Sequence, residues 1–137
     1  MKIVVASDSF KGSLSSTEVA TAAARGIKSV CPDCEAVAVS VADGGEGTVD
    51  AVVEALGGKI VTATVNDPLG RPILACYGVV GKMAVIEMAA ASGLTLLKDE
   101  ERNPWLTSTY GTGEMIMDAV KRGCRDFLVG VGGSATN

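Results

Sequence analysis

Four short segments of the chain combine glycine with hydroxyl, carboxylate and amide side chains. They are residues 8–13, 43–48, 108–113 and 130–137. At least three of them are expected to lead into a helix. Glycine lets the backbone approach a ligand closely and present its N–H groups, and a helix N-terminus adds partial positive charge. One such loop is common in α/β proteins, but four in 137 residues indicate a protein that holds phosphates and other small anions.

The side chains available in these loops limit the types of reaction that the chain could catalyse. Histidine is absent from the chain. Ser–His and Cys–His nucleophile pairs therefore cannot be built from it. Carboxylates, a lysine, an arginine, hydroxyls and backbone amides remain. This set suits phosphoryl transfer, in which a protein mainly positions groups and stabilises charge, with Mg²⁺ helping.

Three residues are candidates for catalysis. Lys11 follows Asp8 by three positions and would neutralise a phosphate or a carboxylate, although a lone lysine is often only a solvated surface group. Asp43 precedes a glycine-rich run; it or Glu46 would hold Mg²⁺ or accept a hydroxyl proton. Alternatively, Asp43 or Thr48 only caps the next helix, but a cap does not need three glycines. We take Asp8, Lys11 and Asp43 as catalytic candidates, with Asp43 as the candidate magnesium ligand.

A larger set of residues would bind substrate or phosphate. Arg71, in a Pro-Leu-Gly-Arg-Pro turn, would fork onto a carboxylate or phosphate, or would simply be solvated. Glu87 between two apolar residues would pair with a cation or face a cleft. Thr112 could be only a helix cap, which would leave its neighbouring glycines unexplained. The binding candidates are Ser9, Gly12, Gly44, Gly45, Glu46, Arg71, Thr109, Gly111, Thr112, Gly113, Gly132, Gly133, Ser134 and Asn137.

Composition excludes several classes of protein. The net charge is −4 and the 12 basic residues form no stripe, so a nucleic-acid partner is not expected. No apolar run approaches the roughly 20 residues needed to span a bilayer, and the N-terminus does not resemble a signal peptide. A cytoplasmic protein is expected, with its oligomeric state left open.

The four cysteines are expected to be free thiols. Cys31 and Cys34 form a lone CxxC at the expected end of a helix, whereas redox-active thiols of this kind lie at helix N-termini. A zinc site would need a second pair of ligands, and Cys76 and Cys124 are isolated.

The pattern over residues 1–65 predicts a parallel βαβαβ domain of the Rossmann or flavodoxin type. Strands are expected at residues 2–7, buried on both faces, and at 35–41 and 59–65. A capping box formed by Ser15 and Glu18 predicts a helix to about residue 30. A second helix, 48–56, should end at Gly57. Ligands gather at the carboxyl ends of parallel strands.

Residues 66–137 read as the beginning of a second, mixed α/β domain. A turn at 67–72 precedes a hairpin of strands 73–80 and 83–88, joined at Gly81. A short helix at 89–94, a charged loop at 99–104, a helix at 112–122 and a buried strand at 126–131 follow. The last strand leads into a glycine-rich loop with no helix after it, so the chain is expected to be the N-terminal part of a longer protein.

Six blocks together resemble the type I glycerate kinases of bacteria. No block is specific alone, but the six in order are, and they run the length of the chain. They are residues 8–15, 42–48, 68–72, 87–94, 108–114 and 132–137.

The resemblance implies two α/β domains with the active site between them, and ATP-dependent phosphorylation of glycerate. Together with the side-chain inventory, it gives the leading hypothesis of phosphoryl transfer from Mg-ATP to D-glycerate. The product implied is 2-phosphoglycerate, typical of this type, or 3-phosphoglycerate. The alternative is a fragment of such an enzyme that binds nucleotide or anions without turnover; the 137-residue piece alone is expected to be inactive.

Overall fold

The computed structural model describes residues 1–8, 10, 13–41 and 43–136. It divides the chain into two compact units, Met1–Asp43 and Gly44–Asn137. The sequence placed the boundary after residue 65. The structure instead puts the second helix and third strand with the residues that follow, because both pack against the later hairpin.

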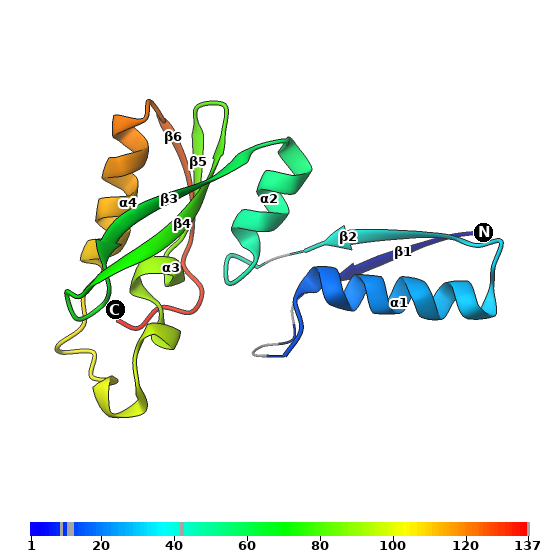
Figure 1. Cartoon of the computed structure of the whole chain (residues 1–137), viewed down its shortest axis with the longest axis horizontal. Coiled ribbons are helices and arrows are strands. Elements are labelled where there is room, and N and C mark those ends of the chain that lie inside the picture. The colour runs from blue at the N-terminus through cyan, green and yellow to red at the C-terminus, as the bar shows by residue number, and fades with distance from the viewer. Residues whose placement is uncertain (9, 11–12, 42, 137) are drawn as a thin grey trace. The chain divides into compact units, whose positions relative to one another are not determined.

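The first unit is a single βαβ motif, in which a helix connects two parallel strands (Figure 1). Strands β1 (Lys2–Ser7) and β2 (Glu35–Ser40) pair in parallel, and helix α1 (Ser16–Val30) packs against both. The predicted capping box is confirmed: the Ser15 hydroxyl accepts from the Glu18 N–H at 3.3 Å, and the Glu18 carboxylate accepts from the Ser15 N–H at 2.8 Å. β1 is not buried on both faces as expected, because within this unit a single helix covers the two strands, and its residues alternate between exposed and half-buried.

The end of α1 differs from the sequence prediction. Cys31 and Cys34 form a disulfide, so the expectation of four free thiols is wrong for this pair. Only two residues separate them, and the turn after α1 brings their Cα atoms to 5.3 Å, within reach of a bridge. Cys76 and Cys124 are free thiols.

The second unit is a four-stranded mixed sheet in the order β3-β4-β5-β6. Strands β3 (Lys59–Asn66), β4 (Pro72–Val80) and β5 (Met83–Glu87) are antiparallel neighbours, and β6 (Asp126–Gly130) pairs in parallel with β5. The predicted parallel βαβαβ sheet is therefore wrong in its third strand. β3 runs antiparallel to β4 because a five-residue turn joins them, whereas parallel strands need a long crossover.

Helices cover both faces of this sheet. Helix α4 (Tyr110–Lys121) and the short α3 (Ala89–Ser92) pack on one face, where Tyr77, Ile86 and Met115 form a buried core. Helix α2 (Thr48–Leu56) lies on the other face, as Figure 1 shows, with Val53 against Gly78. Two 3₁₀ turns, η1 (Leu94–Leu96) and η2 (Asp99–Glu101), precede α4. Helix α2, the glycine that closes it (Gly57) and the hairpin at Gly81 were all predicted.

Strand β6 is less buried than the sequence indicated. Phe127, Leu128 and Val129 are each about two-fifths exposed, since β6 is at the sheet edge and β5 is its one strand neighbour among the described residues. Among the described residues, no helix combines the length and apolar character required to cross a bilayer.

Candidate functional site

Two of the glycine-rich segments contact each other in the second unit. Residues 44–47 lead into α2, and residues 130–134 comprise the last residue of β6 and the segment after it. The Gly132 N–H donates to the Gly44 carbonyl at 3.1 Å. A Cβ atom on Gly130 would lie 2.3 Å from that same carbonyl oxygen. The contact therefore requires glycine, and it brings two predicted phosphate-binding segments side by side.

Hydrogen bonds made by two side chains, those of Thr48 and Glu87, fix the first turn of α2 and the loop before it. The Thr48 hydroxyl accepts from the Gly44 N–H at 3.1 Å and donates to the Gly45 carbonyl at 2.8 Å. Glu87, at the end of β5, accepts from the Val49 N–H at 2.7 Å. Thr48 thus organises the loop before α2. It does not cap the helix as the alternative predicted, because Thr48 is already its first residue and the N-cap position is Gly47, which forms no side-chain cap bond. Glu87 is the anion at this helix N-terminus.

Burial raises the pKa of Glu87 above its ordinary value. Hydrogen bonds from the first-turn N–H groups oppose this effect, and the nearby charge of Asp50 adds to it. The sequence left open whether Glu87 would pair with a cation or face a cleft. The structure shows a half-buried carboxylate that both caps α2 and lines a cavity.

The cavity has a volume of about 290 Å³ and lies where α3 begins. Two of its lining side chains are carboxylates, and one is a hydroxyl. It is lined by Glu46, Glu87, Ala89, Ala90, Thr95, Leu96 and Gly133. Glu46 and Gly133 were binding candidates. Thr95 was missed: it lies in the 3₁₀ turn η1, and no motif marks it.

The segment after β6 is fixed to the same unit. Gly133 accepts from the Leu94 N–H at 3.0 Å, and the Ala135 N–H donates to the Ser92 carbonyl at 2.8 Å. The Ser134 hydroxyl donates to the Thr136 carbonyl at 3.1 Å. These bonds hold the segment across α3. Asn137, the last binding candidate, lies outside the described residues.

The third glycine-containing segment, residues 108–113, is used mainly for packing, and its residues from Tyr110 on are already helical because α4 begins two residues before the predicted start. A Cβ atom on Gly111 would lie 1.8 Å from the Asn66 carbonyl oxygen, and the buried Thr112 hydroxyl is 2.8 Å from that of Ser92. Thr109 precedes α4 without a side-chain cap bond. Gly113 is exposed, and no atom of the described residues lies within 4 Å of where its Cβ would be. Gly111 and Thr112 thus have structural reasons to be present, and their role in binding stays a prediction.

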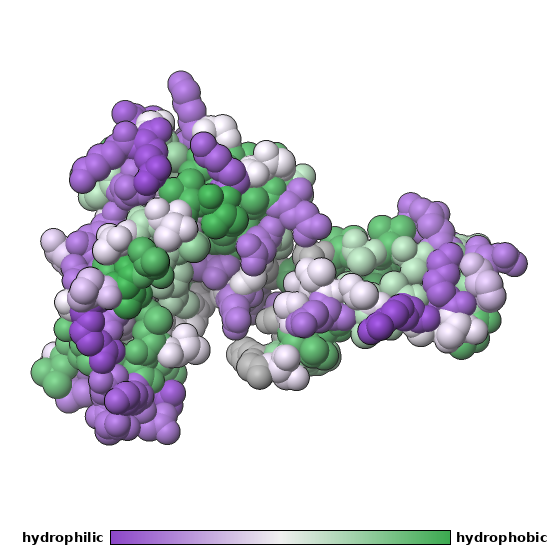
Figure 2. All heavy atoms as spheres, in the orientation of Figure 1, coloured by the Kyte–Doolittle hydropathy of each residue, from purple (hydrophilic) through white to green (hydrophobic). Residues whose placement is uncertain are grey.

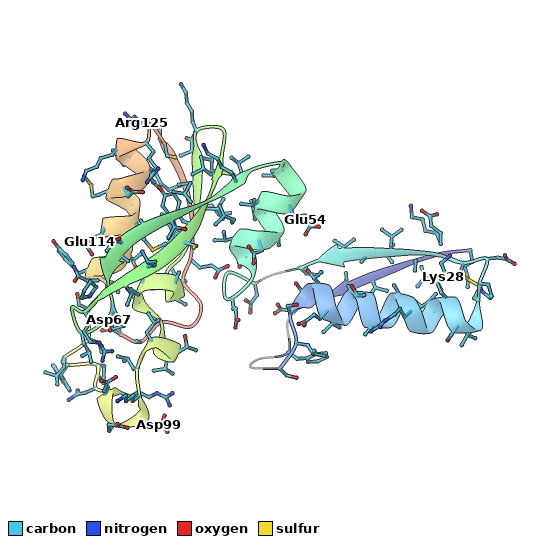
Figure 3. The ribbon with its side chains drawn as sticks, in the orientation of Figure 1. Lys28, Glu54, Asp67, Asp99, Glu114 and Arg125 are labelled. Atoms are coloured by element: carbon cyan, nitrogen blue, oxygen red, sulfur yellow. A yellow bond between two sulfur atoms is a disulfide. The ribbon has the colours of Figure 1, made fainter. Side chains whose placement is uncertain are left out.

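Arg71 is surrounded by structural partners. Its Nε donates to the buried Asp67, its Nη1 donates to Glu101 at 2.8 Å, and its Nη2 donates to the Leu96 carbonyl at 3.3 Å. Burial raises the pKa of Asp67, but hydrogen bonds from Arg71 and Leu69 outweigh it, so the pKa is lowered overall. This network fixes the β3–β4 turn, where Figure 3 labels Asp67.

The catalytic candidates belong to the first unit. Asp8 directly follows β1, and Asp43 lies three residues beyond β2. The strands are parallel and in register to Ser7 and Ser40, so each carboxylate follows a strand whose carboxyl end lies at the same edge of the sheet. Ser9, Lys11 and Gly12 lie outside the described residues.

Comparisons with known proteins agree on one family. The model of the glycerate kinase family matches residues 3–137. A glycerate kinase of Haemophilus influenzae is 52% identical over the whole chain, which spans 37% of that protein. A glycerate 2-kinase of Escherichia coli is 50% identical, again over the whole chain and 36% of its own length.

A solved structure gives the same result. A crystal structure from Salmonella typhimurium LT2, assigned as glycerate kinase 2, superposes with a TM-score of 0.81 at 50% identity. The chain is covered completely and spans 37% of that structure. The chain thus covers little more than a third of the relatives it matches, and it belongs to the glycerate kinase family.

Proposed function

We propose that the protein containing this chain transfers the γ-phosphoryl group of Mg-ATP to a hydroxyl of D-glycerate. The observation that carries the proposal is the family match over residues 3–137. The two contacting glycine segments support it, because they supply closely packed backbone and a helix N-terminus of the kind used to hold phosphate groups. A cytoplasmic location is part of the proposal.

Residue roles follow from side-chain chemistry. Asp8 or Asp43 would accept the hydroxyl proton of glycerate, and the other carboxylate would hold the metal. Lys11 would neutralise a substrate carboxylate or phosphate, with Arg71 as a second candidate cation. The segments around Gly111–Gly113 and Gly132–Asn137 would bind phosphate oxygens.

Mg²⁺ fits the donors in the chain. Among the described residues, no three carboxylates or thiols are grouped as a metal cluster. Mg²⁺ is commonly held by only one or two carboxylates together with substrate phosphates. Asp43 is the proposed ligand and Glu46, in the same loop, is the second candidate. When bound, the ion would neutralise charge that develops on the transferred phosphoryl group.

The regiochemistry proposed is 2-phosphoglycerate, with 3-phosphoglycerate as the other outcome. Relatives carry both the general name and the name glycerate 2-kinase. The product is identified from the phosphorus NMR spectrum: a phosphate on the secondary carbon couples to one proton and gives a doublet, whereas one on the primary carbon couples to two and gives a triplet.

The decisive experiment is a coupled ADP-release assay on the full-length protein with Mg-ATP, with and without D-glycerate. Glycerate-dependent ADP release supports the proposal. ADP release that is unchanged by glycerate overturns it. Calorimetric binding of Mg-ATP without any turnover would instead favour a non-catalytic binding module.

A further inference from the structure

A second cavity lies at the opposite end of the sheet from Glu87. It is formed where β3 begins and β4 ends, beside the end of α4, and has a volume of about 360 Å³. The cations Lys59 and Arg122 line it, together with Val61, Val79 and the backbone of nearby glycines. Figure 3 labels Arg125 at this end and Asp67 at the other.

Arg122 is held in position by Asp118, which is itself bonded to the buried Tyr77. The fully buried Tyr77 donates its hydroxyl proton to the Asp118 carboxylate at 2.7 Å. The same carboxylate oxygen accepts from Arg122 Nε at 2.7 Å. That bond uses one side of the guanidinium. Within the part of the chain that the structure describes, the terminal nitrogens have no hydrogen-bond partner, so they can bind another acceptor. An arginine fixed in this way loses less side-chain entropy when it binds an anion than a mobile one would.

Positive charge is concentrated at this end of the unit. Lys59 has no hydrogen bond or ion pair among the described residues, and Lys82 lies in the β4–β5 turn next to Gly81, which lines the cavity. The chain as a whole carries a net charge of −4, so a cluster of basic side chains differs in sign from the net charge of the chain. Figure 2 shows hydrophilic side chains collected at this end, beside a hydrophobic patch.

Helix C-termini explain only part of this charge. Cations commonly offset the partial negative charge of a helix end. Arg125 does so directly, since its Nη1 donates to the Val120 and Cys124 carbonyls at 3.1 Å and 2.6 Å. Arg122 and Lys59 make no such bond to a helix carbonyl among the described residues. An interaction with a helix C-terminus therefore does not explain why Arg122 and Lys59 line this cavity.

We propose that this cavity binds a small phosphorylated metabolite. The phosphate lies between the Arg122 guanidinium, which suits two oxygens at once, and the Lys59 ammonium. The carbon part of the ligand contacts Val61 and Val79. None of the residues that line this cavity is assigned to phosphoryl transfer, so the inference stands whether or not the proposed activity is found.

The test is the rate at which phenylglyoxal modifies Arg122 in the full-length protein, read from peptide masses, with inorganic phosphate as the probe. Arg102 is an internal control, because its side chain is 45% exposed against 50% for Arg122 and it too is paired with an aspartate. Phosphate is expected to slow modification of Arg122 several-fold and leave Arg102 unchanged.

Lys59→Met should abolish the protection, whereas Lys98→Met, a change of the same kind elsewhere on the unit, should not. Equal protection of both arginines, or none at either, would overturn the proposal. Protection of Arg122 that persists in Lys59→Met would do so too. The wild-type comparison does not depend on the folding of any variant.

Discussion

The carboxylate of Glu87 accepts a hydrogen bond from the backbone N–H of Val49, which joins the end of β5 to the first turn of α2 across 38 positions of sequence. The bond orients α2 and so places the loop before it, including Glu46 and the glycines that contact the segment after β6. A single half-buried carboxylate thus links the sheet to both glycine-rich segments.

This arrangement predicts a specific pH dependence of stability. The pKa of Glu87 is raised in the folded state, mainly by burial, from an unfolded value near 4.5. The folded state therefore binds the proton more tightly, and the free energy of unfolding falls as pH rises from about 4.5 through the folded pKa. Glu87→Gln keeps an acceptor for Val49 and removes that fall.

Urea unfolding of both proteins from about pH 4 to pH 8 measures the difference, which should grow in favour of the variant as pH rises. Glu46→Gln, at an exposed position in the adjacent loop, is the matched control. Parallel stability curves for wild type and Glu87→Gln would show that Glu87 does not carry this effect.

Two glycines in one turn of α4 should respond oppositely to alanine. Gly111→Ala would place a Cβ atom 1.8 Å from the Asn66 carbonyl oxygen, so a loss of about 2–3 kcal/mol or more is expected. Gly113→Ala meets nothing within 4 Å and should gain about 0.5–1 kcal/mol from helix propensity. Thermal and urea unfolding decide between them. Similar effects for both would contradict the packing explanation of Gly111.

Local features were predicted well because they depend on neighbours in sequence. The capping box at Ser15, the left-handed glycine at Gly57 and the hairpin at Gly81 each need only a few adjacent residues. The family resemblance was confirmed because it used six such blocks in order.

Long-range relationships were not available from the pattern. The strand at Lys59–Asn66 could have joined either sheet, and its direction was decided by a short turn stabilised by Asp67 and Arg71. The Glu87–Val49 bond and the contact between Gly44 and Gly132 join segments that are distant in sequence. Thr95 likewise lines the cavity because tertiary packing places η1 beside segments that are distant in sequence.

The cysteines give a direct test of the first unit. In the native protein one thiol of this chain, the exposed Cys76, should react quickly with Ellman's reagent, while the buried Cys124 reacts only on unfolding. Reduction should release two more, from Cys31 and Cys34. Loss of this bridge should also lower stability; for so short a loop the chain-entropy estimate is roughly 2 kcal/mol. Peptide mapping of this chain that shows four free thiols before reduction would contradict the disulfide.

The proposed activity makes Asp8 and Asp43 the most informative positions. If one carboxylate accepts the hydroxyl proton and the other holds Mg²⁺, then Asp8→Asn and Asp43→Asn should each reduce turnover of the full-length protein by orders of magnitude. Asp33→Asn, in the turn between α1 and β2, is the matched control and should leave turnover unchanged. Unfolding midpoints measured on the same samples separate lost chemistry from lost folding. Near-normal turnover in either variant would remove that residue from the assignment, and a metal requirement that shifts only in Asp43→Asn would assign the magnesium ligand to Asp43.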